Sequence, residues 1–317
     1  MILVVTLNPA LDVTHHVPRV DWSGVNRPTA AAARPGGKGV NVARTLHALG
    51  ADVLAVGLAG GLTGAAVRSG LSKAGVPAAF TDIAGETRRT FAVVDDQRRR
   101  TALFNEPGPR VSAGEYQRFR ARYADALPGC AAVVLSGSLP PGVPADSYAE
   151  LTAMAATASV PAVLDAEGQA LLRGAPGGPA IVKPNLAELE RSMGRPLSTP
   201  AGFDRAAVIG AARELMAAGA QSVVVSLGAD GLLAVTGDGL WHAAPPDQTP
   251  GNPTGAGDAV VAGLAHGLVL GRCWRERLRH AVALGTAAAA APVAGEFRHA
   301  DYHELLSGVR IATGEAG

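Results

Sequence analysis

The sequence has little of the chemistry that marks disulfide-linked, zinc-binding or nucleic-acid-binding proteins. Its 317 residues include two cysteines, Cys130 and Cys273, which are far apart and form no CxxC spacing, so neither a disulfide framework nor a zinc site is indicated. The formal net charge is only +1, which argues against a polyanionic partner such as nucleic acid. We therefore expect a cytoplasmic protein that acts on small molecules.

Long apolar runs are also missing. The longest, residues 281–294, consists mainly of alanine and is interrupted by Gly285 and Pro292, so no segment is predicted to cross a membrane. The first dozen residues lack the basic start and the longer apolar core of a secretory signal. With 48% hydrophobic residues, a chain of this length can bury one large core.

Short apolar runs alternate with helix-length segments along the chain. Strands that are apolar on both faces and separated by helices are typical of a mainly parallel sheet covered on both sides, in which ligands bind at the carboxyl ends of the strands. We predict one α/β domain over residues 1–317, a three-layer αβα sandwich. The predicted strands are 2–7, 53–58, 132–135, 162–165, 180–182 and 222–226, and the predicted helices are 40–49, 65–74, 145–157, 186–193, 205–217 and 259–270.

Two segments interrupt this alternation, residues 13–34 and 86–105. The second reads as two strands joined by a polar turn at residues 95–100. Both segments end beside a glycine-rich or charged candidate site. We predict that together they form a small antiparallel β lid at the edge of the main sheet.

The strongest candidate site is PTGAGD, residues 253–258, which directly precedes a helical pattern. Its glycines would let backbone N–H groups converge on a phosphate at the positive end of a helix. Asp258 would repel that phosphate unless it faces an incoming hydroxyl group and takes its proton as the γ-phosphoryl group transfers. An ordinary helix start with an acid in its first turn explains the motif alone equally well.

A second glycine-rich turn, GGKGVNVAR at residues 36–44, also leads into a predicted helix. The spacing GxxxxGK[ST] is absent, so nucleotide binding does not follow from it. Free N–H donors, the point charge of Lys38 and the amide of Asn41 suit the hydroxyls and phosphate of a sugar. A plain tight turn is the alternative.

Three further segments follow predicted strands: residues 136–142, 183–188 and 226–231. Within the second, Asn185 and Glu188 have the spacing of a capping box, a role compatible with holding a Mg²⁺-bound water. The other two segments, taken alone, are also explained as ordinary loops rich in glycine and proline.

Taken together and in this order, TLNPALD, GGKGVNVAR, GETRRT, GSLPPGVP, VKPNLAELE, SLGADG and TGAGD resemble the PfkB (ribokinase-like) sugar kinases along almost the whole chain. The opening NPALD, the lysine of GGKG and the arginine of GETR are most similar to the branch of 1-phosphofructokinases and tagatose-6-phosphate kinases. The resemblance implies a ribokinase-like fold, ATP and Mg²⁺ as cofactors, and a homodimer formed through the lid.

The resemblance also implies functional roles for residues within these motifs. Because Lys38 and Arg88 come from different segments, the phosphate of the substrate could draw the lid closed and exclude water. The implied residues are Asp258 as catalytic base, with the N–H groups of Gly255, Ala256 and Gly257 stabilising developing charge; Asp12, Gly37 and Asn41 for sugar hydroxyls; Lys38, Arg88 and Ser138 for the sugar's phosphate; Lys183, Asn185, Ser226, Gly228, Gly231 and Gly257 for ATP; and Asn185 with Glu188 for Mg²⁺ through water.

Two positions depart from the family pattern. Ala166 and Glu167 follow Asp165 where relatives usually carry a small hydroxyl residue, and Ala259 follows GAGD where serine is frequent. We expect the first departure to alter substrate or phosphate contacts. We expect the second to be tolerated, because backbone groups make the contacts there.

The leading functional hypothesis is a 1-phosphofructokinase, which converts fructose 1-phosphate to fructose 1,6-bisphosphate. Tagatose-6-phosphate kinase and 6-phosphofructokinase remain as alternative functions. The substrates of the three enzymes differ in the position of one phosphate, which sequence patterns separate poorly. A kinase that acts on a neutral sugar or on a nucleoside is a further hypothesis, because such kinases share the GAGD core. A non-catalytic sugar-phosphate sensor is disfavoured by intact Asp258, Asn185 and Glu188, and an NAD-binding oxidoreductase by the missing Rossmann fingerprint.

Overall fold

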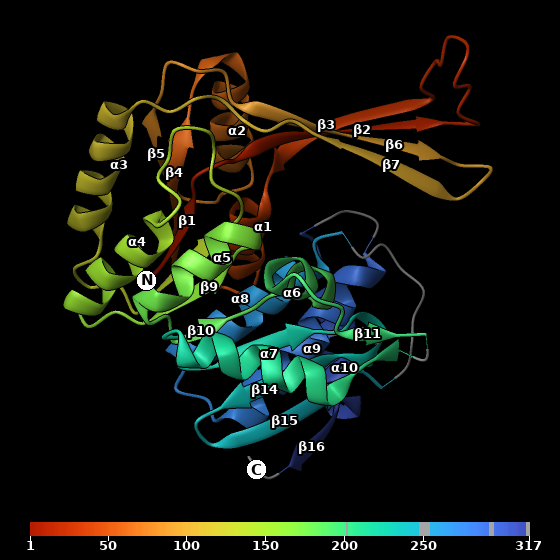
Figure 1. The fold of residues 1–317 in the computed structure, drawn as a ribbon. Helices are drawn as coiled ribbons and strands as arrows, with labels where there is room; N and C mark the ends of the chain where they lie inside the picture. Colours follow the sequence, from red (N-terminus) through yellow and green to blue (C-terminus); the bar gives the residue numbers. More distant parts are fainter. Residues whose placement is uncertain (201, 247–253, 292–294, 315–317) are drawn as a thin grey trace.

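The main sheet of the protein is mostly parallel and runs through the whole molecule. The computed structural model describes residues 1–200, 202–246, 254–291 and 295–314 (Figure 1). Within these ranges the sheet has ten strands, and all six predicted strands are among them. In spatial order they are β16 (Arg310–Gly314), β15 (Gly239–Ala244), β14 (Leu232–Thr236), β13 (Val223–Ser226), β10 (Ile181–Val182), β9 (Ala162–Asp165), β8 (Ala132–Ser136), β1 (Ile2–Thr6), β4 (Val53–Ala59) and β5 (Ala78–Asp82).

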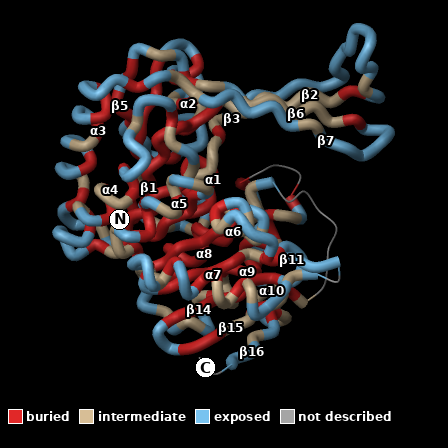
Figure 2. Tube along the Cα trace, viewed as in Figure 1, coloured by how far each residue is buried: buried red, intermediate tan, exposed pale blue. Residues whose placement is uncertain are grey.

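The parallel part of the sheet extends from β13 to β5, and the C-terminal strands β14, β15 and β16 add to it in antiparallel pairs. Because side chains alternate between the faces of a strand, the sheet has a hydrophobic core on each side. In β1, Ile2 and Val4 belong to one core, whereas Leu3 and Val5 belong to the other. Figure 2 shows buried residues concentrated along β1 and the other inner strands, whereas the edge strand β16 is largely exposed.

Helices cover both faces, which confirms the predicted three-layer αβα architecture. All six predicted helices are present. One face carries α1 (Lys38–Ala48), α2 (Gly61–Lys73), α8 (Ala256–Val269), α9 (Trp274–Ala290) and α10 (His299–Gly308). The other carries α3 (Ala113–Ala126), α4 (Ser147–Thr157), α5 (Gly168–Gly174), α6 (Leu186–Met193) and α7 (Arg205–Ala217).

Helix α8 begins three residues earlier than predicted. Ala256 and Gly257 were expected in the loop before the helix, but they are its first residues, and Gly255 precedes them with a left-handed φ of 85°. Glycine adopts that conformation without the steric cost of a Cβ atom. The glycines of the motif therefore place the N-terminus of α8 close to the pocket, and Pro253 lies outside the described residues.

A small second sheet projects from the body as an arm (Figure 1). Its two hairpins are antiparallel, as expected, and they join through a parallel pairing of the two inner strands. The lid leaves from the carboxyl ends of β5, an edge strand, and of β1, the third strand from that edge. Its strands, in spatial order, are β3 (Ala30–Gly36), β2 (Ala10–Val17), β6 (Arg88–Asp95) and β7 (Arg100–Asn105).

A short hairpin of β11 (Ser198–Thr199) and β12 (Gly202–Phe203) lies apart from both sheets. Single 3₁₀ turns occupy Ala175–Gly177 and Gly228–Asp230. In the part of the chain that the structure describes, no helix combines the length and hydrophobicity that a membrane crossing requires.

Candidate active site

One large cavity, of about 1070 Å³, lies between the lid, the carboxyl ends of the central strands and helices α8 and α9. Every residue for which the sequence analysis gave a role lines this cavity. Such convergence follows from the topology, because parallel strands present their carboxyl ends at one side of the sheet. The lining residues with a predicted role are Asp12, Gly37, Lys38, Asn41, Arg88, Ser138, Lys183, Asn185, Glu188, Ser226, Gly228, Gly231, Gly255, Ala256, Gly257 and Asp258.

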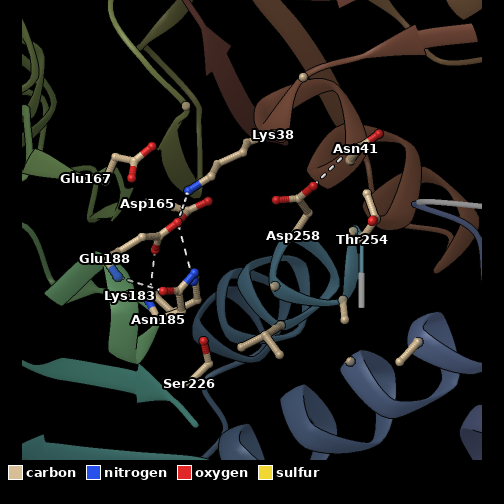
Figure 3. A pocket seen from close by; sticks show the side chains of 18 of the residues that line it. Lys38, Asn41, Asp165, Glu167, Lys183, Asn185, Glu188, Ser226, Thr254 and Asp258 are labelled. Carbon is tan, nitrogen blue, oxygen red and sulfur yellow. Dashed lines mark hydrogen bonds and ion pairs between the residues drawn. The ribbon is translucent and has the colours of Figure 1, made fainter. Parts of the chain in front are cut away.

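Asp258 lies in the first turn of α8 and is almost completely buried. Asn41 on α1 donates a hydrogen bond from Nδ2 to Asp258 Oδ2 at 2.8 Å, as Figure 3 shows. The N-cap residue is Gly255, which has no side chain that could cap the N-terminus of α8. Its first N–H groups therefore remain available to an anion in the cavity, at the positive end of the helix dipole.

The environment of Asp258 favours its protonated form. Burial, followed by the negative charge of Asp165, raises the pKa of Asp258 from 3.8 to about 7, although Lys38, Asn41 and Lys183 act in the opposite direction. A carboxylate with a pKa near neutrality both accepts and releases a proton readily at physiological pH. This property is typical of a general base and is uncommon for a first-turn acid on a helix surface.

A network of charged side chains occupies the floor of the cavity around Asp165, the last residue of β9. Lys183 Nζ lies 3.3 Å and Lys38 Nζ 3.5 Å from Asp165 Oδ1, and Ser136 donates to Oδ2 at 3.0 Å. Burial opposes ionisation of Asp165, but the two lysines and the hydrogen bonds outweigh it and hold its pKa below the ordinary value. The network therefore fixes a negative charge beneath Lys38.

Lys38 also forms an ion pair with Glu188, with 2.7 Å between Nζ and Oε1. Its side chain is 31% exposed and reaches from α1 across the cavity toward α6 (Figure 3). Burial lowers the pKa of Lys38, but the charges of Asp165 and Glu188 more than reverse this, so the net change is upward. Lys38 is therefore firmly protonated, and its charge lies beside the acids on the α6 side of the cavity.

The predicted capping box at the start of α6 is confirmed. Asn185 Oδ1 accepts a hydrogen bond from the Glu188 N–H group at 2.7 Å, and Glu188 Oε2 accepts one from the Asn185 N–H group at 2.8 Å. The described residues contain no group of three or more His, Cys, Asp or Glu side chains arranged to hold a metal directly. Two buried carboxylates, Glu188 and Asp165, nevertheless suit a hydrated Mg²⁺, which needs few protein ligands when phosphates complete its shell.

The lid supplies the opposite wall of the cavity. Arg88 at the start of β6 donates from Nε to the Asn8 carbonyl and from Nη1 to the Glu106 carbonyl, each at 3.2 Å. Burial lowers the pKa of Arg88, although the charges of Asp12 and Glu106 act in the opposite direction, and among the described residues neither carboxylate forms an ion pair with it. Asp12 on β2 accepts a hydrogen bond from Thr90 on β6, and its pKa is raised, chiefly by burial.

Gly37 provides the turn that brings α1 to the cavity. It has a φ of 92°, and a Cβ atom there would lie 3.3 Å from the backbone Cα of Pro9. Only glycine satisfies both the left-handed conformation and the close approach without strain. The start of α1, with Lys38 and Asn41, is thereby positioned between the lid and α8.

The sequence profile of the pfkB family carbohydrate kinases matches residues 6–296. The chain belongs to the PfkB family. Its structure is similar to that of Escherichia coli phosphofructokinase-2 in complex with fructose-6-phosphate, with 31% identity, a TM-score of 0.86, and coverage of 96% of this chain and 98% of that one. The tetrameric inhibited form of that enzyme matches over the same shares, also at 31% identity, with a TM-score of 0.87.

A Thermotoga maritima protein named "possible 1-phosphofructokinase" is similar as well, with 27% identity, a TM-score of 0.87, and coverage of 99% of this chain and 100% of that one. These matches confirm the ribokinase-like fold and the family that the sequence motifs indicated. This PfkB protein is accordingly a phosphotransferase whose acceptor is a hydroxyl group of a carbohydrate.

The PfkB cavity also contains residues that the sequence analysis gave no role. Asp165 was noted only as the start of a departure, yet it is the centre of the charge network. Its position at the carboxyl end of a buried apolar strand was the signal that could have identified it. Further unassigned lining residues include Asn8, Thr90, Leu103, Leu232, Pro245, Val260, Val282, Gly285, Thr286 and Ala289.

The two departures from the PfkB pattern lie in different environments. Glu167 lines the cavity, and its carboxylate forms an ion pair with Arg191 of α6, with 2.6 Å between Oε2 and Nη2. Ala259 is fully buried in the core beneath α8. A serine in place of Ala259 would therefore not place its hydroxyl group in the cavity. A change at Glu167, by contrast, alters the charge of the cavity wall.

Proposed function

We propose that this protein transfers the γ-phosphoryl group of ATP to a hydroxymethyl group of a ketohexose phosphate, with fructose 1-phosphate as the leading substrate. The observation that carries the proposal is that Arg88 shares one cavity with the buried carboxylate of Asp258. The guanidinium of Arg88 donates hydrogen bonds to two carbonyl oxygens, and the charges of Asp12 and Glu106 act on it without forming an ion pair among the described residues. Its charge is thus available to a phosphate already present on the substrate.

In the proposed reaction Asp258 removes the proton from the acceptor hydroxyl group. The hydroxyl oxygen forms a bond to the γ-phosphorus, the bond between that phosphorus and the bridging oxygen breaks, and ADP leaves. The N–H groups of Gly255, Ala256 and Gly257 stabilise the charge that develops on the transferring oxygens. Asn41 supports this chemistry, because its hydrogen bond holds the Asp258 carboxylate in place.

ATP is assigned to the side of the cavity formed by β13, α8 and α9, where Ser226, Gly228 and Gly231 lie. Lys183, Asn185 and Gly257 line the same cavity, and we assign them to the phosphates of ATP. Glu188 and Asn185 would hold hydrated Mg²⁺, which when bound neutralises the phosphate charge. Lys38 would contribute a further positive charge at the transferring group or at the substrate's own phosphate.

At the sugar side, Asp12, Gly37 and Asn41 are assigned to hydroxyl groups, and Arg88 with Ser138 to the phosphate. Closure of the lid over the sugar would exclude water, which otherwise competes as acceptor. Fructose 6-phosphate is a specific second candidate, because the E. coli relative with 31% identity was solved in complex with that compound. Tagatose 6-phosphate is a third candidate, and a neutral sugar would leave Arg88 without its role.

The test is ADP release by the purified protein with Mg²⁺-ATP and each of five acceptors: fructose 1-phosphate, fructose 6-phosphate, tagatose 6-phosphate, fructose and ribose. We expect the highest kcat/KM for fructose 1-phosphate and much lower values for the two neutral sugars. Preference for another phosphorylated ketose would change the substrate and keep the mechanism. Turnover of neutral sugars alone would overturn the proposal.

We further propose that two copies associate through their lids. Phe104 on β7 is 52% exposed, and Trp22 in the loop between β2 and β3 is 74% exposed, so the lid presents large apolar side chains to solvent. A second copy would cover them. Sedimentation equilibrium should give a dimer, and replacement of Phe104 and Trp22 by serine should shift it to monomer; a wild-type monomer at high protein concentration would contradict this assignment.

A further inference from the structure

Asn8 lies where the chain passes from the core into the lid. It is placed between β1, a buried strand of the main sheet, and β2, the first lid strand, and is only 6% exposed. Because it precedes Pro9, its backbone is restricted to extended conformations. Asn8 is therefore a rigid point beside the cavity, which its side chain lines.

Three contacts of Asn8 involve both walls of the cavity. Its Nδ2 donates to Ser138 Oγ and to the Pro107 carbonyl, each at 3.0 Å. Its own carbonyl accepts the hydrogen bond from Arg88 Nε at 3.2 Å. One residue thus contacts Arg88 and Ser138, two of the side chains that the proposed function assigns to the phosphate of the substrate, and also the segment through which the chain leaves the lid.

The chemistry of these partners fixes the orientation of the Asn8 amide. The Pro107 carbonyl can only accept a hydrogen bond, so the NH₂ group of Asn8, and not Oδ1, must face it. Oδ1 points instead toward Gly108, where a Cβ atom would lie only 2.3 Å away, and it has no donor partner among the described residues. The space beside the amide therefore requires the glycine at this position.

The orientation of the amide in turn determines what Ser138 can do. An NH₂ group can only donate, so the Ser138 hydroxyl accepts on Oγ and its own proton is left for another acceptor. Ser138 is exposed to the cavity, and its loop is held in place because the buried Tyr148 donates to the Gly137 carbonyl at 3.0 Å. The hydroxyl is thus preset to donate into the cavity.

We propose that Asn8 is a positioning residue that holds Ser138 as a hydrogen-bond donor to the phosphate of the substrate, in fixed relation to Arg88. This inference rests on the proposed function, because it requires a phosphorylated acceptor. Asn8 itself does not touch the reacting atoms. Its contribution appears in the binding of the phosphorylated sugar and not in the phosphoryl-transfer step.

The test is a double-mutant cycle with Asn8→Ala and Ser138→Ala, with KM for the preferred ketose phosphate as the readout. Loss of one hydrogen bond is expected to raise this KM about threefold to tenfold in each single variant. If Asn8 acts through Ser138, the double variant should be no worse than Ser138→Ala. We expect kcat and the KM for ATP to stay within about twofold of the wild-type values.

A second variant, Asn8→Asp, keeps the shape of the side chain. Its carboxylate would accept the Ser138 proton and add a negative charge, so we expect a larger rise in KM for the ketose phosphate, about tenfold or more. Gln117→Glu is the matched control, because it makes the same chemical change on the exposed surface of α3. It should leave all kinetic constants unchanged.

The outcomes distinguish this inference from the proposed function. Independent, multiplying effects of Asn8→Ala and Ser138→Ala on KM would overturn the inference alone, as would an Asn8→Ala variant with unchanged KM. A fall in kcat that accompanies a lower melting temperature would also overturn it, because that pattern indicates a merely structural role at the base of the lid. Wild-type protein that phosphorylates no ketose phosphate would overturn the proposed function and this inference with it.

Discussion

Replacement of Asp258 by asparagine should make the folded protein more stable at alkaline pH than the wild type. The wild-type carboxyl group is buried near Asp165, and its pKa is raised from 3.8 to about 7. The folded state therefore binds more protons than the unfolded state between these two pH values. In this window the free energy of unfolding falls as the pH rises, and it levels off above about pH 7.

The size of the effect follows from the two pKa values. Each pH unit between them corresponds to about 1.4 kcal/mol, so the complete loss is about 4 kcal/mol, of which about 2 to 3 kcal/mol falls between pH 5 and pH 8. The Asp258→Asn variant has no charge to bury at this position. It also keeps an oxygen that can accept the hydrogen bond from Asn41 Nδ2.

The assay is urea unfolding of both proteins at pH 5 and pH 8. Other titrating groups are common to the two proteins, so the difference between their unfolding free energies isolates Asp258. This difference should shift in favour of the variant by about 2 to 3 kcal/mol from pH 5 to pH 8. An unchanged difference, or a shift in favour of the wild type, would refute the argument that burial and Asp165 raise this pKa.

Three further predictions concern other parts of the site. Arg88→Ala should raise the KM for the ketose phosphate about tenfold or more, since a hydrogen bond to a charged group is lost, and steady-state assays showing an unchanged KM would contradict the assignment. Glu188→Gln keeps the cap of α6 but removes the charge beside Lys38, so activity should require a higher Mg²⁺ concentration; an unaltered Mg²⁺ titration would exclude this role. Gly231→Ala should destabilise the fold by about 1 to 3 kcal/mol in urea unfolding, because φ is 84° and a Cβ atom would lie 2.0 Å from the Ala243 carbonyl oxygen; wild-type stability would contradict it.

Local sequence patterns predicted the central strands and several helices, because an apolar run or a helix cap can be recognised within a short segment of the chain. Helices α6 and α7 have the predicted bounds, and α6 is delimited by its capping box and by Gly194, which has a left-handed φ of 65°. Helix α9 was not predicted, because its alanine-rich sequence is buried on several sides and shows no clear apolar stripe. The hairpin of β14 and β15 was not predicted either, although residues 237–238, glycine and aspartate between two apolar runs, are a hairpin signal.

The candidate site shows where sequence patterns reach their limit. Local motifs pointed to Lys38, Asn41, Asn185, Glu188 and Asp258, because these residues lie in glycine-rich turns or in a capping box. The roles of Asp12, Arg88 and Ser138 came from the family resemblance. The pairing of Lys38 with Glu188, 150 residues apart, depends on the spatial order of the strands and could not be predicted from local patterns. The same holds for Asp165, whose two lysine partners come from α1 and from the end of β10.

The central claim is that Asp258 removes the proton from the acceptor hydroxyl group. The most direct test compares ADP release by wild-type and Asp258→Asn proteins with the preferred ketose phosphate, while calorimetry measures the binding of ATP and of the sugar phosphate. We predict that kcat falls by about 10²–10⁴-fold and that both ligands bind with nearly unchanged affinity. A variant that binds both ligands and retains a kcat within about tenfold of the wild-type value would contradict the account.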